Sequence, residues 1–508
     1  MRLTNNHFTR KLLLTLGVIV CAQAGALAQT LWEEGRNIAG EAAGAGLGHS
    51  ADASIGAKYT SGNFRSPSMG KTLITGAAEA AAVSSFEDIY LKGNFGFELV
   101  RGTDMMGSMF SEPGFYPVDV LEFTPGIKIK QTYSIGGGLA WKNSSRWTPG
   151  ITLDFQGVNY AKRKDLRHTT YRQVFEAVPS VHYRGDLVQL GLSAILGKNS
   201  EFIQAEQVGQ AKAEPYMAFL DKGMRYGSMQ VWDGSGTHLK EPGVDRFPVK
   251  QYIGGAALQA SVGKFLYGDL EYRYSRGEVG EKGYTWFIVP GHTFEGKIIG
   301  TIRGESATHI IRADGSFNYL ENYETVIEKV TDGGVSTPVV YGSNRIYRHE
   351  GYSASLSYRF MHRRGWMAGT SVEFEGNWDM GTLMYPYYDD DRSRHLRWAV
   401  MGMVPLGKRF ILRGGGTFIC KIGEHTHVVD VADPSIGITS TPYRLQDWWD
   451  REQEAADATR FLLNAALRFN FGPGLYVEAG CAWLHGFEIK LLSGSDRQTS
   501  YLKFGYNF

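Results

Sequence analysis

Charged side chains placed two residues apart recur along the chain and are its clearest candidates for chemistry. Glu271 and Arg273 form one such pair, and Glu373 and Glu375 form another. Residues i and i+2 of an extended strand point to the same face, so each pair would present both charges to one side of a sheet. Single charges at the same alternate positions of other candidate strands are Arg359, Arg397, Arg413, Arg468 and Glu478.

The mixed sign of these charges permits two arrangements on the inside of a closed sheet. The arginines could form a basic ladder opposite the glutamates, which would place a transverse field across an open channel. Alternatively, arginines and glutamates could join in a web of ion pairs that fills a narrow interior. The sequence leaves both arrangements open.

Two other groupings could hold a metal ion. His425 and His427 would share one face of a strand and could bind one metal together, and Asp389–Asp391 could hold a hard cation such as Ca²⁺. Neither grouping has the spacing of a known zinc or calcium motif. We therefore interpret both as solvated loops and predict no metal and no other cofactor.

One stretch, Asp447–Thr459, has the pattern of a helix. Asp447 is a candidate N-cap, and the first two turns are acidic, which the helix dipole favours. Trp448 and Trp449 could grip a sugar or a partner protein, but simple packing against the barrel rim is the favoured interpretation. The many serines and the 13 histidines show no spacing that selects a nucleophile and its base, so we do not expect an enzyme.

The elements that must position these residues are strands, because apolar and polar residues alternate along the chain. From Ile89 to Leu99, and again from Trp366 to Trp378, every second residue is apolar or small. These segments reach the roughly 9–11 residues that a tilted strand needs to cross a bilayer, and aromatic residues gather at their ends. The pattern predicts an all-β fold, a transmembrane antiparallel β-barrel.

The spacing of the strands predicts their number. Short turns alternate with longer connections, which we expect at 102–126, 202–249, 276–292, 326–345, 380–393, 423–457 and 489–497. About 17 strands are clear, and a hairpin turning at 303–306 would give the even number that bacterial barrels normally have. We therefore predict 16–18 strands, with 18 favoured and with long extracellular loops.

The N-terminus has the features of a secretory signal peptide. Arg2, Arg10 and Lys11 precede the apolar core Leu12–Val20, and Ala26–Ala28 supplies small residues for cleavage. We expect residues 1–28 to be this signal, residues 29–48 to form an N-terminal segment that can enter the lumen, and residues 49–508 to form the barrel. An uncleaved membrane anchor is the alternative, which the short apolar core disfavours.

Composition excludes several classes of protein. Lys and Arg total 53 against 52 Asp and Glu, so the chain lacks the basic excess of a nucleic-acid binder. Three cysteines are too few for a disulfide framework or a zinc array. Cys420 and Cys481 fall on outward registers of different strands, so we expect no disulfide between them. Glycine, at 64 residues, is abundant, as are aromatic residues at 13%.

The last strand supports a family resemblance. Leu502, Phe504, Tyr506 and Phe508 lie on one face, and Phe508 ends the chain. This arrangement resembles the C-terminal signal of Gram-negative outer-membrane proteins, which the barrel assembly machinery reads by strand pairing. The resemblance makes Tyr506 and Phe508 the assembly signal. In length and in the pattern of its residues the chain resembles mid-sized, mostly uncharacterised outer-membrane barrels of Bacteroidota.

The resemblance implies a function in the cell outer membrane. It implies a porin-like channel or uptake component for small polar solutes; the alternative is a non-conducting accessory or binding barrel that partners another transport complex through its loops. The implied partners are outer-membrane lipid, lipopolysaccharide, the assembly machinery, and a transporter or surface lipoprotein, with no nucleic acid. The chain departs from TonB-dependent transporters, which have 22 strands and a plugged lumen.

Overall fold

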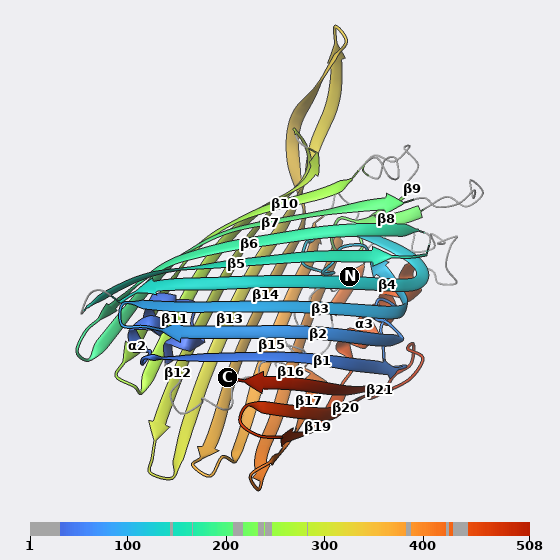
Figure 1. Ribbon diagram of the computed structural model, residues 1–508. Helices are drawn as coiled ribbons and strands as arrows, with labels where there is room; N and C mark the ends of the chain where they lie inside the picture. The colour runs from blue at the N-terminus through green and yellow to red at the C-terminus, as the bar shows by residue number, and fades with distance from the viewer. Residues whose placement is uncertain are drawn as a thin grey trace.

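In the computed structural model, one wide barrel accounts for most of the chain (Figure 1). The structure describes residues 31–142, 146–164, 166–206, 217–231, 238, 246–281, 283–382, 388–422, 426–429 and 445–508. The expected signal peptide therefore lies outside the described residues. Within the described ranges no helix is long and apolar enough to cross a membrane.

The described elements follow one another along the chain with these bounds. The helical elements are η1 (Leu31–Glu34), α2 (Ile38–Gly44) and α3 (Leu445–Asp457). The barrel strands are β1 (Gly48–Gly62), β2 (Thr72–Ser85), β3 (Ile89–Ser108), β4 (Asp119–Trp141), β5 (Trp147–Lys162), β6 (Arg167–Arg184), β7 (Val188–Glu206), β10 (Phe247–Val262), β11 (Leu266–Glu281), β12 (Tyr284–Arg303), β13 (Ala307–Asp332), β14 (Val335–His362), β15 (Met367–Thr382), β16 (Tyr388–Leu406), β17 (Phe410–Lys421), β19 (Arg460–Asn470), β20 (Leu475–Gly486) and β21 (Asp496–Asn507). Three short strands lie outside the barrel wall: β8 (Met217–Asp221), β9 (Gly227–Val231) and β18 (Thr426–Val429).

The wall closes because the first and last strands pair. Each barrel strand pairs antiparallel with its neighbour along the chain, and β1 then pairs with β21 from Asp52↔Asn507 to Gly62↔Arg497. Of the 21 described strands in the sheet, β8, β9 and β18 lie outside the wall, so the barrel has 18 strands. The favoured number is confirmed, and the additional hairpin, β12–β13, turns at residues 304–306 as expected.

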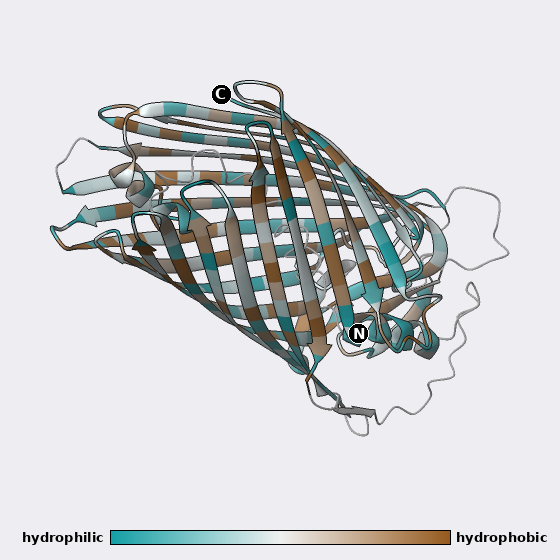
Figure 2. Ribbon diagram, turned by 90° about the horizontal axis from the view of Figure 1, so that it is seen from below, coloured by the Kyte–Doolittle hydropathy of each residue, from teal (hydrophilic) through white to brown (hydrophobic). Residues whose placement is uncertain are grey.

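Side chains alternate between lipid and lumen along every strand. Large apolar residues on the outward register stay exposed, for example Leu270 at 65%, Ile298 at 58% and Leu356 at 58%. Figure 2 shows hydrophobic and hydrophilic segments alternating along the ribbons of the wall. A closed barrel with an apolar outer surface leaves no backbone group unpaired in lipid, and this architecture places the protein in the cell outer membrane.

The two ends of the barrel differ. At one end the connections are short, such as 86–88, 263–265, 304–306 and 407–409, which is the periplasmic arrangement. At the other end, three predicted long connections are wrong, because strand pairing continues through them. In the first, β11 runs to Glu281 and β12 begins at Tyr284; in the second, β13 and β14 are joined by the two residues 333–334. In the third, β15 extends to Thr382 and β16 begins at Tyr388.

The helix near residue 450 begins at Leu445, two residues before the predicted N-cap. Asp447 therefore lies in the first turn, where its negative charge still favours the helix dipole. The helix lies at the same end of the barrel as β8, where Trp449 packs on Phe219 (Figure 1).

Removal of Phe508 tests the closing seam. The Phe508 amide donates a hydrogen bond to the Ala51 carbonyl oxygen at 2.8 Å, and its ring packs on Tyr506 at 4.4 Å. Without these contacts, we expect several-fold less barrel that keeps its compact mobility on an unheated gel. The control is Phe471→Ala, which removes an exposed ring from a neighbouring periplasmic turn. A normal amount of folded barrel from the deletion variant would contradict this role.

Candidate functional site: the barrel lumen

The N-terminal segment, residues 31–45, lies against the inner wall near the periplasmic end. Trp32 is 3% exposed and donates a hydrogen bond from Nε1 to the Ser261 hydroxyl at 3.2 Å. Its ring packs edge-on against His182 and Tyr267, which belong to β6 and β11. Ile38, at 1% exposed, packs with Tyr90 and Ala140 of β3 and β4. The segment therefore touches the wall on several strands at once.

Polar contacts fix the same segment. Arg36 forms ion pairs with Glu176 and, at 3.3 Å, with Glu271. Asn37 caps α2 by accepting a hydrogen bond from the Gly40 amide at 2.9 Å, and its own amide reaches Gln259 at 3.2 Å. These contacts satisfy the start of a short helix with groups from the barrel wall.

Glu41 is held in a less polar setting. Its carboxylate accepts a hydrogen bond from Lys92 at 3.0 Å and another from the Tyr90 hydroxyl at 3.3 Å. Burial raises the pKa of the Glu41 carboxyl, and the Lys92 ammonium opposes this shift. A partly desolvated ion pair stabilises the contact only while both partners keep their geometry.

At the outer end, strands β3 and β4 bend over the mouth of the barrel. The register shifts twice between Gly102 and Gly107, and Asp104 and Gly107 have positive φ angles of 57° and 94°. These bulges turn the strand ends inward. The outer part of β4 then pairs with β8 instead of β5, and β8 pairs with β9. We call β8, β9 and the strand ends with their connection, residues 102–126, the cap.

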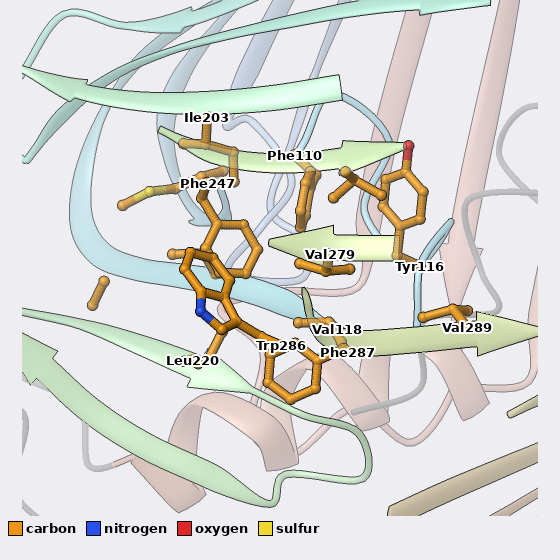
Figure 3. Packing of buried hydrophobic residues seen from close by; sticks show 14 of the residues in the cluster. Phe110, Tyr116, Val118, Ile203, Leu220, Phe247, Val279, Trp286, Phe287 and Val289 are labelled. Carbon is orange, nitrogen blue, oxygen red and sulfur yellow. The ribbon is translucent and has the colours of Figure 1, made fainter. Parts of the chain in front are cut away.

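The cap packs on an apolar band of the inner wall (Figure 3). Phe110 and Tyr116 come from the β3–β4 connection and are 1% and 2% exposed. They meet inward-facing residues near the outer ends of the wall strands, namely Ile203, Phe247, Val279, Phe287 and Val289. The outer end of the lumen on this side is therefore packed like the core of a soluble protein.

Arg172 anchors the tip of the cap to the wall. It pairs with Glu112 of the β3–β4 connection, its guanidinium lies 4.2 Å from the Phe115 ring, and its Nε donates to Asn199 at 3.0 Å. Burial raises the pKa of the Tyr116 hydroxyl well above its ordinary value, and the carboxylate of Glu201 adds to the shift.

Helix α3 closes the other side of the mouth. Trp448 and Trp449 are 0% and 7% exposed and pack with Phe123 and Phe219 of the cap. The two tryptophans therefore pack, as the favoured interpretation predicts, and the residues they contact belong to the cap. Glu452 accepts hydrogen bonds from the amide and hydroxyl of Ser68 at 2.6 and 2.9 Å. Burial raises the pKa of Glu452, and the bonds from Ser68 act against this.

The sequence-predicted charges lie on the inward register, and three ion pairs join members of this set to one another. Glu271 pairs with Arg273 on its own strand. Arg397 pairs with Glu373 at 3.0 Å across β15 and β16. Arg413 pairs with Glu478 at 2.9 Å, although β19 lies between their strands. Glu478 is 0% exposed, so this pair behaves as a buried structural contact.

The remaining predicted residues differ in their surroundings. Arg468 lies 3.5 Å from the Tyr476 ring and donates to Asn470 at 3.0 Å, while Glu375 is half-buried. Arg359 is exposed on the inward register of β14. Tyr506 and Phe508 point outward and are 38% and 75% exposed. The predicted web of ion pairs thus accounts for some of the predicted lumen-lining residues, whereas Arg359 faces solvent inside the barrel.

Sequence reasoning missed the most accessible inward-facing residues. Lys92, Asn94 and Glu98 follow one another on the inward face of β3, and all are exposed. Asp154 of β5 and Glu295 of β12 are also inward and exposed. The alternation along each strand predicts that these residues face inward, but only the folded barrel shows which of them remain exposed to solvent. Asn94, Glu98, Asp154 and Glu295 line a polar middle zone of the wall, which we call the central chamber. Lys92 and Arg359 lie nearer the periplasmic turns, at the level of the N-terminal segment.

Metal ligands do not cluster in the part of the chain that can be described, where no group of three or more His, Cys, Asp or Glu side chains is placed to hold an ion. Glu424 and His425 lie outside the described residues, and His427 belongs to β18. Asp390 is engaged by Trp378, whose Nε1 donates to it at 2.9 Å. Cys420 and Cys481 are free thiols.

Comparison with family models settles the relationship of the chain. A model described as a family of unknown function (DUF6850) matches residues 44–508. The chain belongs to this family. A comparison with curated proteins gives no match. The family match begins within α2, so it includes the whole barrel but little of the N-terminal segment.

Solved structures with a similar outline are outer-membrane barrels of low sequence identity. Pyoverdine-bound FpvA of P. aeruginosa has 8% identity and a TM-score of 0.41, with 91% of this chain and 72% of FpvA covered. BauA, the ferric preacinetobactin receptor from Acinetobacter baumannii, has 8% identity and a TM-score of 0.40, with 91% and 80% covered. A mutant of the monoaromatic hydrocarbon channel TodX has 9% identity and a TM-score of 0.32, with 93% and 92% covered.

Trp32→Ala tests how firmly the N-terminal segment is held. Loss of a buried tryptophan costs about 3–5 kcal/mol, so we expect the segment to detach while the barrel stays folded. Hydrogen exchange of peptides from residues 31–45 should then become much faster. The matched control is Trp147→Ala, which removes a ring that is 53% exposed at the periplasmic rim. Unchanged protection in the Trp32 variant would mean that this ring does not anchor the segment.

Proposed function

We propose that the protein is an outer-membrane uptake component that admits a small polar solute through its lumen. The observation that carries this proposal is the central chamber, where ionisable side chains point inward and remain exposed. A barrel of 16–18 strands is wide enough to leave an aqueous passage. Polar linings of mixed charge suit small solutes that keep part of their hydration.

The cap and α3 pack at the outer mouth, and the N-terminal segment lies against the inner wall at the periplasmic end, so we propose that passage involves a movement of one of them. The cap buries a large apolar cluster, and its displacement would expose that cluster to water. The N-terminal segment is smaller and is held by Trp32, Ile38 and a few polar contacts. Moving the segment therefore requires less free energy than moving the cap, and we propose the segment as the periplasmic gate.

A non-conducting accessory barrel is the second candidate. The same cap and α3 support it, because they pack the outer mouth as a protein core packs. In that case the lumen would only support the loops, and binding would occur on the outer face. Conductance distinguishes the two candidates directly.

Deletion of residues 31–45 from the mature protein should convert small or rare conductance steps into larger and more frequent ones. The physical reason is that the segment is the only described non-strand element packed at the periplasmic end of the lumen. Planar-bilayer recording measures the effect, and unheated gel mobility confirms that the barrel is folded. Trp32→Ala should give an intermediate result. If both proteins are silent, the uptake proposal fails and the accessory role is favoured.

Arg359→Glu should shift ion selectivity toward cations, because it replaces an exposed positive charge on the inward face near the periplasmic end of β14 by a negative one. The reversal potential in a salt gradient measures the shift. Arg276→Glu makes the same change on the outward register near the outer rim and serves as the control. The shift should be measured in the protein without residues 31–45. Equal selectivity in both variants would show that Arg359 does not face the permeation path.

A further inference from the structure

On three neighbouring strands, β7, β10 and β11, the lipid-facing register changes from apolar to cationic at the same height. From the periplasmic turns, the outward positions are apolar, small or aromatic over residues 188–196, 252–262 and 266–274. Each run has the roughly 9–11 residues that a tilted strand needs to cross a bilayer. The next outward residues are Lys198, Lys250 and Arg276, and all three are exposed. They therefore lie at the outer interface of the membrane.

Strand register places these three cations around one tyrosine. Tyr252 is the register partner of Lys198 on one side and of Arg276 on the other, and Lys250 is the next outward residue on its own strand. Two strand spacings separate Lys198 from Arg276, which is about 10 Å between their backbones. Tyr252 is 55% exposed, and the Lys198 Nζ lies 5.9 Å from the centre of its ring. We call Lys198, Lys250, Arg276 and Tyr252 the rim patch.

The rim patch keeps an excess of positive charge. Lys250 is the register partner of Glu278, whose carboxylate lies 3.6 Å from the Arg276 Nε. The two side chains of this ion pair are 55% and 46% exposed, so the pair is weak and leaves the guanidinium accessible. One carboxylate beside three cations leaves the patch positive. Arg246, just before β10, adds an exposed guanidinium 4.5 Å from the Phe202 ring.

The position of the patch decides which anion it would meet. Lys and Arg on the lipid-facing side of a barrel are unfavourable at membrane depth and tolerated near the interfaces. Clusters of such cations bind anionic lipid headgroups, and phosphate accepts strong hydrogen bonds from them. The patch lies at the end of the barrel opposite the short periplasmic turns, so the headgroup belongs to the outer leaflet. In the outer membrane this leaflet consists of lipopolysaccharide, whose lipid A portion is a phosphorylated disaccharide.

We propose that the rim patch binds the phosphorylated headgroup of one lipopolysaccharide molecule. Lys198, Lys250 and Arg276 pair with a phosphate, and the exposed Tyr252 ring packs against the adjoining sugar. The ring makes a phosphorylated sugar a better occupant than a phospholipid headgroup, which has no sugar face to cover it. This inference does not depend on solute uptake.

Arg101 offers a matched position without a cluster. It follows the outward run 91–99 of β3 as the patch cations follow theirs, and it is exposed. Its register partners are Ile74 and Ile129 rather than an aromatic ring between cations. Loss of its charge should therefore leave headgroup binding at the rim patch unchanged.

Native mass spectrometry of the purified, delipidated protein with lipid A that carries two phosphates tests the proposal. Lys250→Gln and Arg276→Gln should each weaken binding about fivefold, because each removes one cation at the membrane surface. Arg101→Gln removes the same charge elsewhere and should not weaken it. Lipid A without phosphates should bind the unaltered protein much more weakly. Unchanged binding in both patch variants, equal weakening by Arg101→Gln, or equal binding of lipid A without phosphates would overturn the proposal.

Phosphatidylglycerol distinguishes a glycolipid site from general attraction to anionic lipid. It should bind the unaltered protein more weakly than phosphorylated lipid A does, and Tyr252→Leu should reduce this difference, because leucine keeps an apolar contact but offers no ring to the sugar. Equal binding of the two lipids to the unaltered protein would overturn the assignment to lipopolysaccharide. The compact mobility of each variant on an unheated gel separates lost binding from lost folding.

Discussion

The structure depends on one constraint: backbone N–H and C=O groups at membrane depth need partners, and lipid offers none. The pairing of β1 with β21 meets this constraint, because without it both strands would be open edges. Closure of 18 strands also sets the alternation of side chains, since each strand must then present one face to lipid and the other to the lumen. The alternation that closure requires thus leaves the inward register to polar side chains.

Closure of so many strands creates a second problem, because the wall's own side chains cannot fill the space that it encloses. The protein fills this space unevenly. At the outer end, the strands β3 and β4 bend inward at bulges and pack as the cap against an apolar band of the wall. At the periplasmic end, residues 31–45 occupy part of the lumen through a few well-placed side chains. The middle zone between them keeps exposed charges.

This uneven filling separates buried charges from charges that stay exposed in the lumen. Glu478 is fully buried beside Arg413, and removal of either partner would leave a buried charge without compensation. Arg359 and Glu98 also lie on the inward register of their strands, but they remain exposed. A solute in the lumen would meet the second kind of residue.

The sequence by itself determined the architecture, because alternation with period two is a local property that every strand carries. It yielded the closed barrel, the favoured count of 18, the hairpin at 304–306 and the inward register of residues such as Glu373 and Arg397. It also indicated a helix near Trp448, with an error of two residues at its start. Only the tertiary structure decided where strands end beyond the membrane, since pairing between neighbours extended β13 and β14 through a predicted loop. Only the tertiary structure decided which inward charges are buried, because burial depends on what the cap, α3 and the N-terminal segment cover, and those contacts join residues hundreds of positions apart.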